Sequence, residues 1–317
     1  MQLPRPCSMV ALACLLVPAV LEGQEPLPPG AEARSLLGQP LVPPPLAPAA
    51  REASERQLAE ARRAYTNTPD NADSIIWLGR RTAYLGRYRE AISIFTEGIR
   101  KHPGDARMYR HRGHRYISIR ELDQAIVDLN RAVELSEDEI DQIEPDGLPN
   151  ARNIPTSTLH FNIRYHLGLA HYLKGEFDQA AKVFREDVAA DLANSYSDML
   201  VASSHWLYMS LRRAGKANEA ARVLEPIRRN LDVIENGVYH RLLLLYKGEL
   251  PPDSLLPRQR ADTATFEDAA TGYGVANWHF YNGRRAEAER LFRQIVTSPQ
   301  WAAFGYIAAE AELARLR

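Results

Sequence analysis

Small residues recur along this chain at a spacing of 34 residues. Gly79 is followed at that distance by Gly113, and Ala91 is followed by Ala125. We expect a small residue late in one predicted helix to face an alanine in the next, so that the two backbones approach closely. Five copies keep this register. A chain with such a period is expected to fold as helix pairs that stack on one another.

Each copy combines a small or apolar residue, a turn glycine, an alanine and a large apolar residue, although no copy has every element. The first copy is Leu78-Gly79, Gly86, Ala91, Phe95 and Pro103, and the later ones include Gly168, Gly175, Ala180 and Phe184, then Leu207, Gly215, Ala220 and Leu224, then Gly283, Ala288 and Phe292.

This pattern resembles the tetratricopeptide repeat, in which W-x2-L-G-x2-Y precedes A-x3-F and a proline. Single copies depart from the consensus: Thr82 stands at the tyrosine position of the first copy, and Tyr208 stands at the glycine position of the fourth. The resemblance covers roughly residues 57–302. It implies an all-α fold, a right-handed α-solenoid of antiparallel helix pairs.

The chain divides into three predicted parts, which are a signal peptide at 1–23, a proline-rich disordered linker at 24–50 and the solenoid at 51–317. Repeats are expected at about 72–105, 106–139, 161–194, 201–234 and 269–302, with a degenerate unit at 235–268. Capping helices are expected at about 51–66 and 302–316, because terminal repeats are atypical. Prolines in the degenerate unit should leave its second helix short or distorted.

The amino terminus has the features of an export signal. Arg5 precedes an apolar stretch from Met9 to Val17, and small residues follow at the spacing of a cleavage site. We therefore expect an exported protein, periplasmic or extracellular or held at the envelope. A lipid anchor at Cys14 is the weaker alternative, because apolar residues continue beyond it. The stretch is too short to span a bilayer.

An insertion interrupts the repeat register at 140–160. It begins with a run of acidic residues and ends in glycine, proline and asparagine. Two interpretations remain open. The insertion is either a lengthened helix with a solvated loop, or a loop that closes over the mouth of the superhelix, since long irregular connections in folded domains are often functional.

The first helix of each pair lines the inner surface of such a solenoid. Helical periodicity predicts that the inward residues are cationic and aromatic, with almost no acid among them. The candidate groove residues are Arg80, Tyr84, Arg107, Arg110, His114, Asn162, Tyr165, Tyr172, His205, Met209, Arg212, Tyr273, Asn277 and Tyr281.

Such a groove favours an extended, acidic ligand. Arginine pairs with carboxylates in a fork geometry, and tyrosine offers a flat apolar wall with a hydroxyl group. The family resemblance implies the same class of ligand, a protein or peptide. The leading hypothesis is therefore a non-catalytic scaffold that binds an acidic peptide or partner segment. The alternatives are a receptor or enzyme for a small anion, closed by the insertion, and a subunit that self-associates through its end helices.

Other functional classes lack support in the sequence. Nucleophile elbows, P-loops and dinucleotide-binding glycine motifs are missing, so we expect neither an enzyme nor a cofactor. His111 and His114 lie three residues apart, but a zinc site needs further ligands, and both cysteines lie in the signal segment. The net charge of −1 gives no general attraction to nucleic acid.

Overall fold

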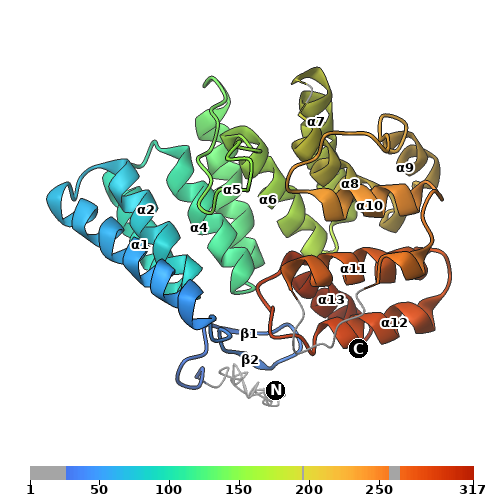
Figure 1. Ribbon diagram of the computed structural model, residues 1–317, viewed down its shortest axis with the longest axis horizontal. Helices are drawn as coiled ribbons and strands as arrows, with labels where there is room; N and C mark the ends of the chain where they lie inside the picture. Colours follow the sequence, from blue (N-terminus) through green and yellow to red (C-terminus); the bar gives the residue numbers. More distant parts are fainter. Residues whose placement is uncertain (1–25, 195, 257–264) are drawn as a thin grey trace, which may run out of the picture.

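The computed structural model describes residues 26–194, 196–256 and 265–317. The predicted signal peptide lies outside these residues, so the structure does not bear on it. The described chain is almost entirely helical, with a single pair of two-residue strands (Figure 1). The all-α fold class is confirmed. No helix among the described residues is long and apolar enough to cross a membrane.

Helix pairs follow one another along the chain and stack side by side. The helices are α1 (Pro48–Asn67), α2 (Ala72–Tyr84), α3 (Tyr88–Lys101), α4 (Ala106–Ser118), α5 (Leu122–Ser136), α6 (Leu159–Lys174), α7 (Phe177–Asn194), α8 (Ser197–Arg213), α9 (Ala217–Val223), α10 (Gly237–Tyr246), α11 (Phe266–Tyr281), α12 (Arg285–Ile295) and α13 (Phe304–Arg315). The strands β1 (Ala33–Arg34) and β2 (Pro40–Leu41) are antiparallel, and η1 (Pro252–Ser254) is a 3₁₀ turn.

Polar side chains fix the starts of several of these helices. Asn71 accepts a hydrogen bond from the Ser74 amide at 2.9 Å ahead of α2. Thr158 does the same ahead of α6, where its hydroxyl accepts from the Phe161 amide at 3.3 Å. Such caps satisfy backbone donors that have no partner inside the helix.

The small residue of each first helix makes room for a large side chain of the second helix. A Cβ added at Gly79 would overlap the ring of Phe95, and one added at Gly113 would meet Leu129. Gly168 faces Phe184 in the same way. The expectation that these glycines face alanines is therefore wrong. The glycine is needed because the large residue four positions after the alanine packs directly on it.

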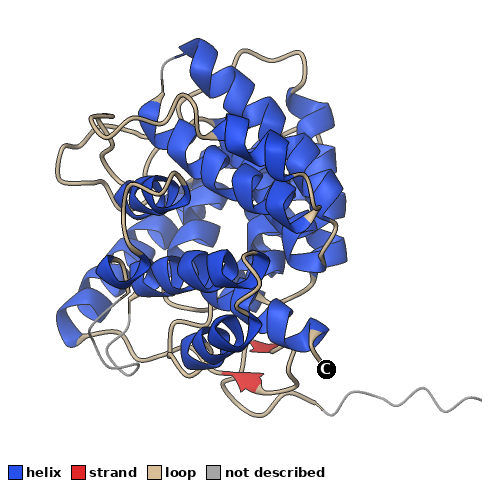
Figure 2. Cartoon of the chain, turned by 90° about the vertical axis from the view of Figure 1, so that its right-hand side faces the viewer, coloured by secondary structure: helices blue, strands red, loops and turns tan. Residues whose placement is uncertain are grey.

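The proline-rich segment is folded over residues 26–47, so its prediction as a disordered linker is wrong there. It forms β1 and β2, which lie between the start of α1 and the carboxy-terminal helices (Figure 1). The Trp301 indole donates to the Val42 carbonyl at 2.7 Å, and the Leu36 amide donates to the Glu310 carboxylate. Figure 2 shows the strands beside the end of α13. The segment therefore ties the first repeats to the last helix.

The carboxy-terminal helices fold back on the centre of the chain. α11 contacts α8, and α13 contacts both α11 and α6. One hydrophobic core therefore runs from the β1–β2 segment through α13. The inner face of the solenoid is covered along its second half.

Two connections differ from a regular repeat array. α9 has only 7 residues and is followed by a long loop before α10, which the sequence pattern did not predict. After α10, the degenerate unit shows only the 3₁₀ turn η1 before residues 257–264, which lie outside the described chain.

Candidate anion-binding site

The predicted groove residues fall into three groups in the structure. Four of them surround a small cavity at the inner ends of α2 and α4. Seven others are buried in the core between α6, α8 and α11. Three lie at the surface. The first group is Arg80, Tyr84, Arg110 and His114; the second is Asn162, Tyr165, Tyr172, His205, Met209, Tyr273 and Asn277; the third is Arg107, Arg212 and Tyr281.

The core group faces inward, but it does not line an open groove. The hydroxyls of Tyr172 and Tyr273 lie 2.6 Å apart, and the Asn277 amide donates to Tyr172 at 2.9 Å. Tyr165 accepts a hydrogen bond from the Trp206 indole at 2.8 Å. These residues contact one another because α11 folds back onto α8. The prediction of one continuous groove is therefore wrong for this half of the molecule.

The remaining core positions confirm that this region is closed. His205 stacks on Tyr239 with ring centroids 4.6 Å apart, and burial lowers the pKa of His205 to about 3. Met209 is fully buried. Asn162 is also buried, and its amide donates to Glu144 at 3.2 Å. A neutral imidazole in an aromatic stack is a packing group, so we remove His205 from the candidate site.

The three residues of the third group lie at two separate places, because Arg212 and Tyr281 contact each other and Arg107 is far along the chain. Arg107 forms ion pairs with Asp105 at 2.6 Å and with Asp73 at 2.7 Å, at the start of α4. Arg212 stacks over the Tyr281 ring at 4.2 Å, at the far end of α8. Neither arginine reaches the cavity between α2 and α4.

The cavity itself has a volume of about 110 Å³. α2, α3 and α4 form its walls, and the insertion at 140–160 covers it. Its lining residues are Arg80, Ala83, Tyr84, Phe95, Arg110, His111, His114, Arg115 and Glu144. Three arginines therefore converge on a space that contains one carboxylate.

Of the three arginines, Arg110 is buried and Arg80 and Arg115 are half-buried. Arg110 forms an ion pair with Glu144 at 3.1 Å, and its Nε atom has no hydrogen-bond partner. Burial lowers the pKa of Arg115 to about 10, so this guanidinium remains protonated at neutral pH. Arg115 is half-buried and has no ion pair within the described chain, and its Cζ atom lies 5.6 Å from the centroid of the Tyr88 ring. A partly desolvated cation without a carboxylate is unfavourable.

The two histidines of the cavity are neutral at pH 7. Burial, and then the neighbouring arginines, lower the pKa of His111 and His114 well below the usual range. The His114 ring lies 4.2 Å from the His166 ring, a contact that suits uncharged imidazoles. With three guanidinium groups and one carboxylate, the lining carries a net charge of about +2.

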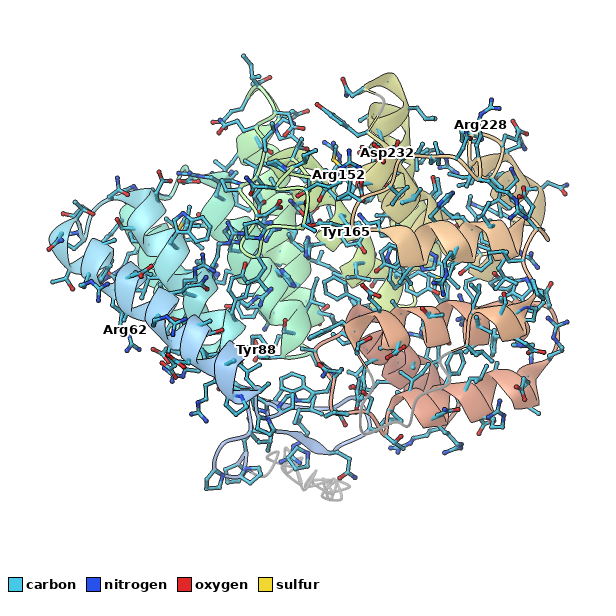
Figure 3. All side chains as sticks on the ribbon, in the orientation of Figure 1. Arg62, Tyr88, Arg152, Tyr165, Arg228 and Asp232 are labelled. Carbon is cyan, nitrogen blue, oxygen red and sulfur yellow. The ribbon has the colours of Figure 1, made fainter. Side chains whose placement is uncertain are left out.

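The insertion closes the cavity by polar contacts with α2. The Pro145 carbonyl accepts a hydrogen bond from Arg80, and the Gly147 carbonyl accepts one from Arg81, both at 2.8 Å. Further along, Arg152 pairs with Asp232 at 2.8 Å. Both residues are labelled in Figure 3. The insertion therefore spans from α2 to the loop before α10.

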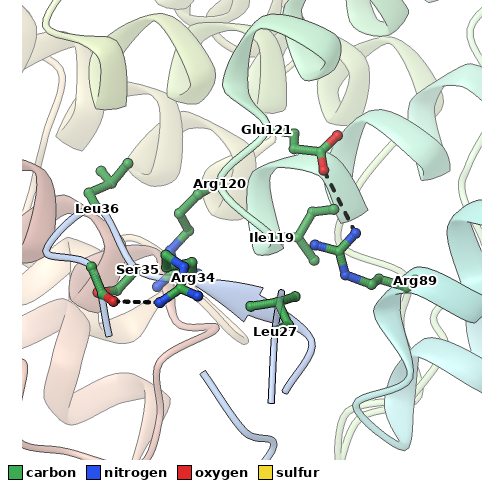
Figure 4. A pocket seen from close by; sticks show the side chains of 9 residues that line it. Leu27, Arg34, Ser35, Leu36, Arg89, Ile119, Arg120 and Glu121 are labelled. Carbon is green, nitrogen blue, oxygen red and sulfur yellow. Dashed lines mark hydrogen bonds and ion pairs between the residues drawn. The ribbon is translucent and has the colours of Figure 1, made fainter. Parts of the chain in front are cut away.

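A larger cavity of about 520 Å³ lies between the amino-terminal segment and the turn joining α4 to α5 (Figure 4). Its arginines already have partners. Arg120 pairs with Glu310 at 2.7 Å, Arg89 lies 3.9 Å from Glu121, and Arg34 donates to the Gly38 carbonyl at 3.0 Å. The α2–α4 cavity is therefore the better candidate for an anion.

Sequence reasoning missed Arg81, Arg115 and Glu144. Arg115 follows His114 directly, and the helical period alone does not decide which of two neighbouring residues points inward. Glu144 sits in an acidic run that has no periodicity, so no local signal marks it. Across the described residues, no group of three or more histidines, cysteines or carboxylates could hold a metal ion.

The stacked helix pairs define an α-solenoid, and the cationic cavity lies within its first repeats. A profile of the tetratricopeptide repeat matches residues 78–140, from within α2 to just beyond α5. Over these residues the chain is similar to the tetratricopeptide repeat, as the repeat pattern predicted. A comparison with curated proteins finds no significant match.

Several solved structures are similar to this chain. A tetratricopeptide repeat protein from Parabacteroides merdae has 14% identity over 84% of this chain and 82% of that one, with a TM-score of 0.47. BtubC from P. vanneervenii has 15% identity over 78% and 89%, with a TM-score of 0.44. YrrB, described as a tetratricopeptide-repeat protein with an unusual peptide-binding site, has 13% identity over 80% and 97%, with a TM-score of 0.42.

Proposed function

We propose that this protein is a non-catalytic interaction scaffold whose α2–α4 cavity holds a carboxylate of an acidic, extended partner segment. Tetratricopeptide repeats serve in general as protein-interaction scaffolds, which gives the broad class. The single observation that carries the finer proposal is Arg115, a half-buried guanidinium that lines the cavity and has no acidic partner among the described residues. An anion from outside would supply the missing charge.

The size of the cavity suits one anionic group. Its volume of about 110 Å³ equals the share of roughly three to four water molecules in the liquid. A carboxylate with an adjoining methylene group fits such a space, whereas a bulky ligand does not. Arg80, Arg110 and Arg115 together offer enough donors to compensate for the lost hydration of the anion.

A small free anion is the second candidate ligand. The observation that favours it is the cover that Pro145 and Gly147 form on the α2 side of the cavity. A receptor for a small carboxylate or phosphate would use the same arginines. We propose no catalytic step, because the cavity histidines already serve as neutral packing groups beside the arginines.

Export stays a proposal drawn from the N-terminal sequence. If the signal is cleaved, the partner segment would meet this protein in the envelope or outside the cell. Both candidate ligands are compatible with that location.

Fluorescence anisotropy with labelled acidic peptides tests the carboxylate proposal. The Arg115→Gln variant should bind at least about tenfold more weakly than the wild type, because a charge-assisted contact is lost. Its stability should not fall, since Arg115 contributes no ion pair in the described chain. Arg212→Gln is the matched control, because Arg212 lies outside the cavity. Equal loss in both variants would contradict the site, and inorganic phosphate as a competitor separates the two ligands.

A further inference from the structure

We infer that the segment Glu144–Gly147 is an internal ligand, which occupies the place of the partner's acidic segment and must leave before the partner binds. This inference rests on the proposed function. It adds the regulation of the site and a sequence preference for the partner.

The segment contacts the site as a bound peptide would. The Glu144 carboxylate enters the cavity and pairs with Arg110 at 3.1 Å, with the His111 ring 4.0 Å away. Its side chain is only 10% exposed. An acidic side chain placed among arginines and neutral histidines is the contact that specifies the ligand.

The main chain of the segment makes contacts that do not depend on sequence. The carbonyls of Pro145 and Gly147 accept hydrogen bonds from Arg80 and Arg81, each at 2.8 Å. A Cβ added at Gly147 would overlap the Tyr84 hydroxyl, so the backbone lies directly against this ring. An extended peptide in a groove is commonly held by such backbone contacts, with side-chain pockets for specificity.

The insertion is held weakly enough to leave. Its large apolar side chains face solvent, with Ile140 90% exposed, Ile143 65% and Leu148 68%. The pairing of Arg152 with Asp232 is also exposed, and exposed ion pairs contribute little stability. Because the insertion buries little apolar surface, polar contacts are its main attachment, at the cavity and, through Asp232 and Glu235, at the loop before α10.

Charge explains why exchange with a partner would be favourable. Glu144 neutralises only one of the three arginines of the cavity. A partner segment with two acidic groups could reach Arg115 as well as Arg110. The partner we expect is therefore an extended acidic segment with glycine three residues after the leading acid, matching Glu144 and Gly147. The apparent affinity for this partner equals its intrinsic affinity multiplied by the fraction of molecules in which the insertion is released.

A labelled peptide with the sequence of residues 141–150 provides the test, because it carries the internal ligand in separate form. We would measure its binding to the full chain, to Glu144→Gln and to a variant in which residues 140–156 are replaced by a short Gly-Ser linker. Glu139→Gln, an exposed acid of the same region, is the matched control. Circular dichroism checks that each variant folds.

Both altered proteins should bind the peptide at least tenfold more tightly than the wild type and Glu139→Gln, and a peptide with glutamine at the Glu144 position should lose that binding. Equal affinity for all four proteins would overturn the internal ligand and leave the proposed function standing. If the linker variant binds other acidic peptides but not the 141–150 peptide, the internal ligand is likewise overturned and the proposed function stands. If the folded linker variant binds no acidic peptide at all, the proposed function fails together with the inference.

Discussion

At the scale of single residues, the buried charges fall into two classes. Some are compensated and structural, as in the Arg120–Glu310 pair, whose side chains are almost fully buried. The half-buried Arg115, by contrast, has no ion pair within the described chain. Charges are normally paired where they lose hydration, because desolvation is expensive. Arg115 is therefore the residue that most directly indicates a ligand.

A pH-dependent stability follows from Asp191 in α7. Burial raises the pKa of Asp191 to about 7, despite the hydrogen bond that it accepts from Ser203 at 2.9 Å. The folded state thus retains a proton that the unfolded state releases from about pH 4 upward, so stability falls as the pH rises from 4 to 7. Asp191→Asn should remove this loss. The free energy of unfolding should rise on the order of 3 kcal/mol above pH 7 and hardly at all at pH 4.

Urea unfolding at pH 4.5, 6 and 8 measures this difference. Glu186→Gln, an exposed carboxylate of the same helix, should leave the pH dependence as it is in the wild type. A stability gain for Asp191→Asn that is the same at all three pH values would show that the carboxyl does not titrate in this range.

At the scale of elements, the glycine of each first helix decides how its partner helix packs. In the α2–α3 pair the Phe95 ring lies where a Cβ of residue 79 would be, and Phe95 is itself only 1% exposed. The α4–α5 pair solves the same problem with Gly113 and the smaller Leu129. Each helix pair is therefore a matched combination of small and large residues, and changing one member requires changing the other.

Gly79→Ala should destabilise the protein by about 1–3 kcal/mol, because overpacking outweighs the gain in helix propensity. Adding Phe95→Leu should recover part of the loss by reproducing the arrangement of the second pair. Gly104→Ala is the control, since a Cβ there meets no atom within 4 Å. Thermal unfolding followed by circular dichroism measures all three, and a neutral Gly79→Ala would contradict the packing account.

Sequence periodicity was sufficient to predict the helix pairs, but not the segments that pack over them. The 34-residue period follows from local packing, which repeats wherever Gly79 or Gly113 recurs. The docking of the proline-rich segment depends on Trp301 and Glu310, which lie more than 250 residues away in the chain and leave no periodic signal near Val42. A regular period also does not predict that α9 has only 7 residues or that the helices after it fold back on the centre of the chain.

The candidate site was predictable in part for the same reason. Arg80 and Arg110 could be placed on the inner face because both lie on regular helices. The carboxylate that meets them comes from an irregular segment, whose path depends on contacts of its backbone rather than on a side-chain pattern. The sequence alone therefore could not distinguish an open groove from a small covered cavity.

At the scale of the whole molecule, a buried contact joins the turn between α4 and α5 to the carboxy-terminal helices. Arg120 has φ of +69° at a turn where the other pairs have glycine, a conformation that costs a non-glycine residue about 1 kcal/mol or more. Its guanidinium donates to Glu310 and to the Trp301 carbonyl, both near the carboxy terminus. The strain is thus retained for a contact that joins the second repeat to the last helix.

Arg120→Gly should relieve this strain and still destabilise the protein by about 2–4 kcal/mol, because Glu310 becomes a buried charge without its partner. Adding Glu310→Gln should restore much of the loss. Urea unfolding followed by tryptophan fluorescence is suitable, since Trp301 lies at this contact. If Arg120→Gly were as stable as the wild type, the packing of the carboxy-terminal helices on the second repeat would not depend on this ion pair.

The central claim is that the insertion occupies an anion-binding cavity and is released when an acidic segment binds there. Hydrogen–deuterium exchange of the wild-type protein with a saturating amount of the 141–150 peptide tests it directly. The amides of Glu144 and Leu159 are now bonded within the insertion, to Ser157 and Gln142. The account predicts that exchange across 141–158 accelerates at least tenfold while the inner ends of α2 and α4 exchange no faster. Saturated binding that leaves exchange across 141–158 unchanged would contradict it.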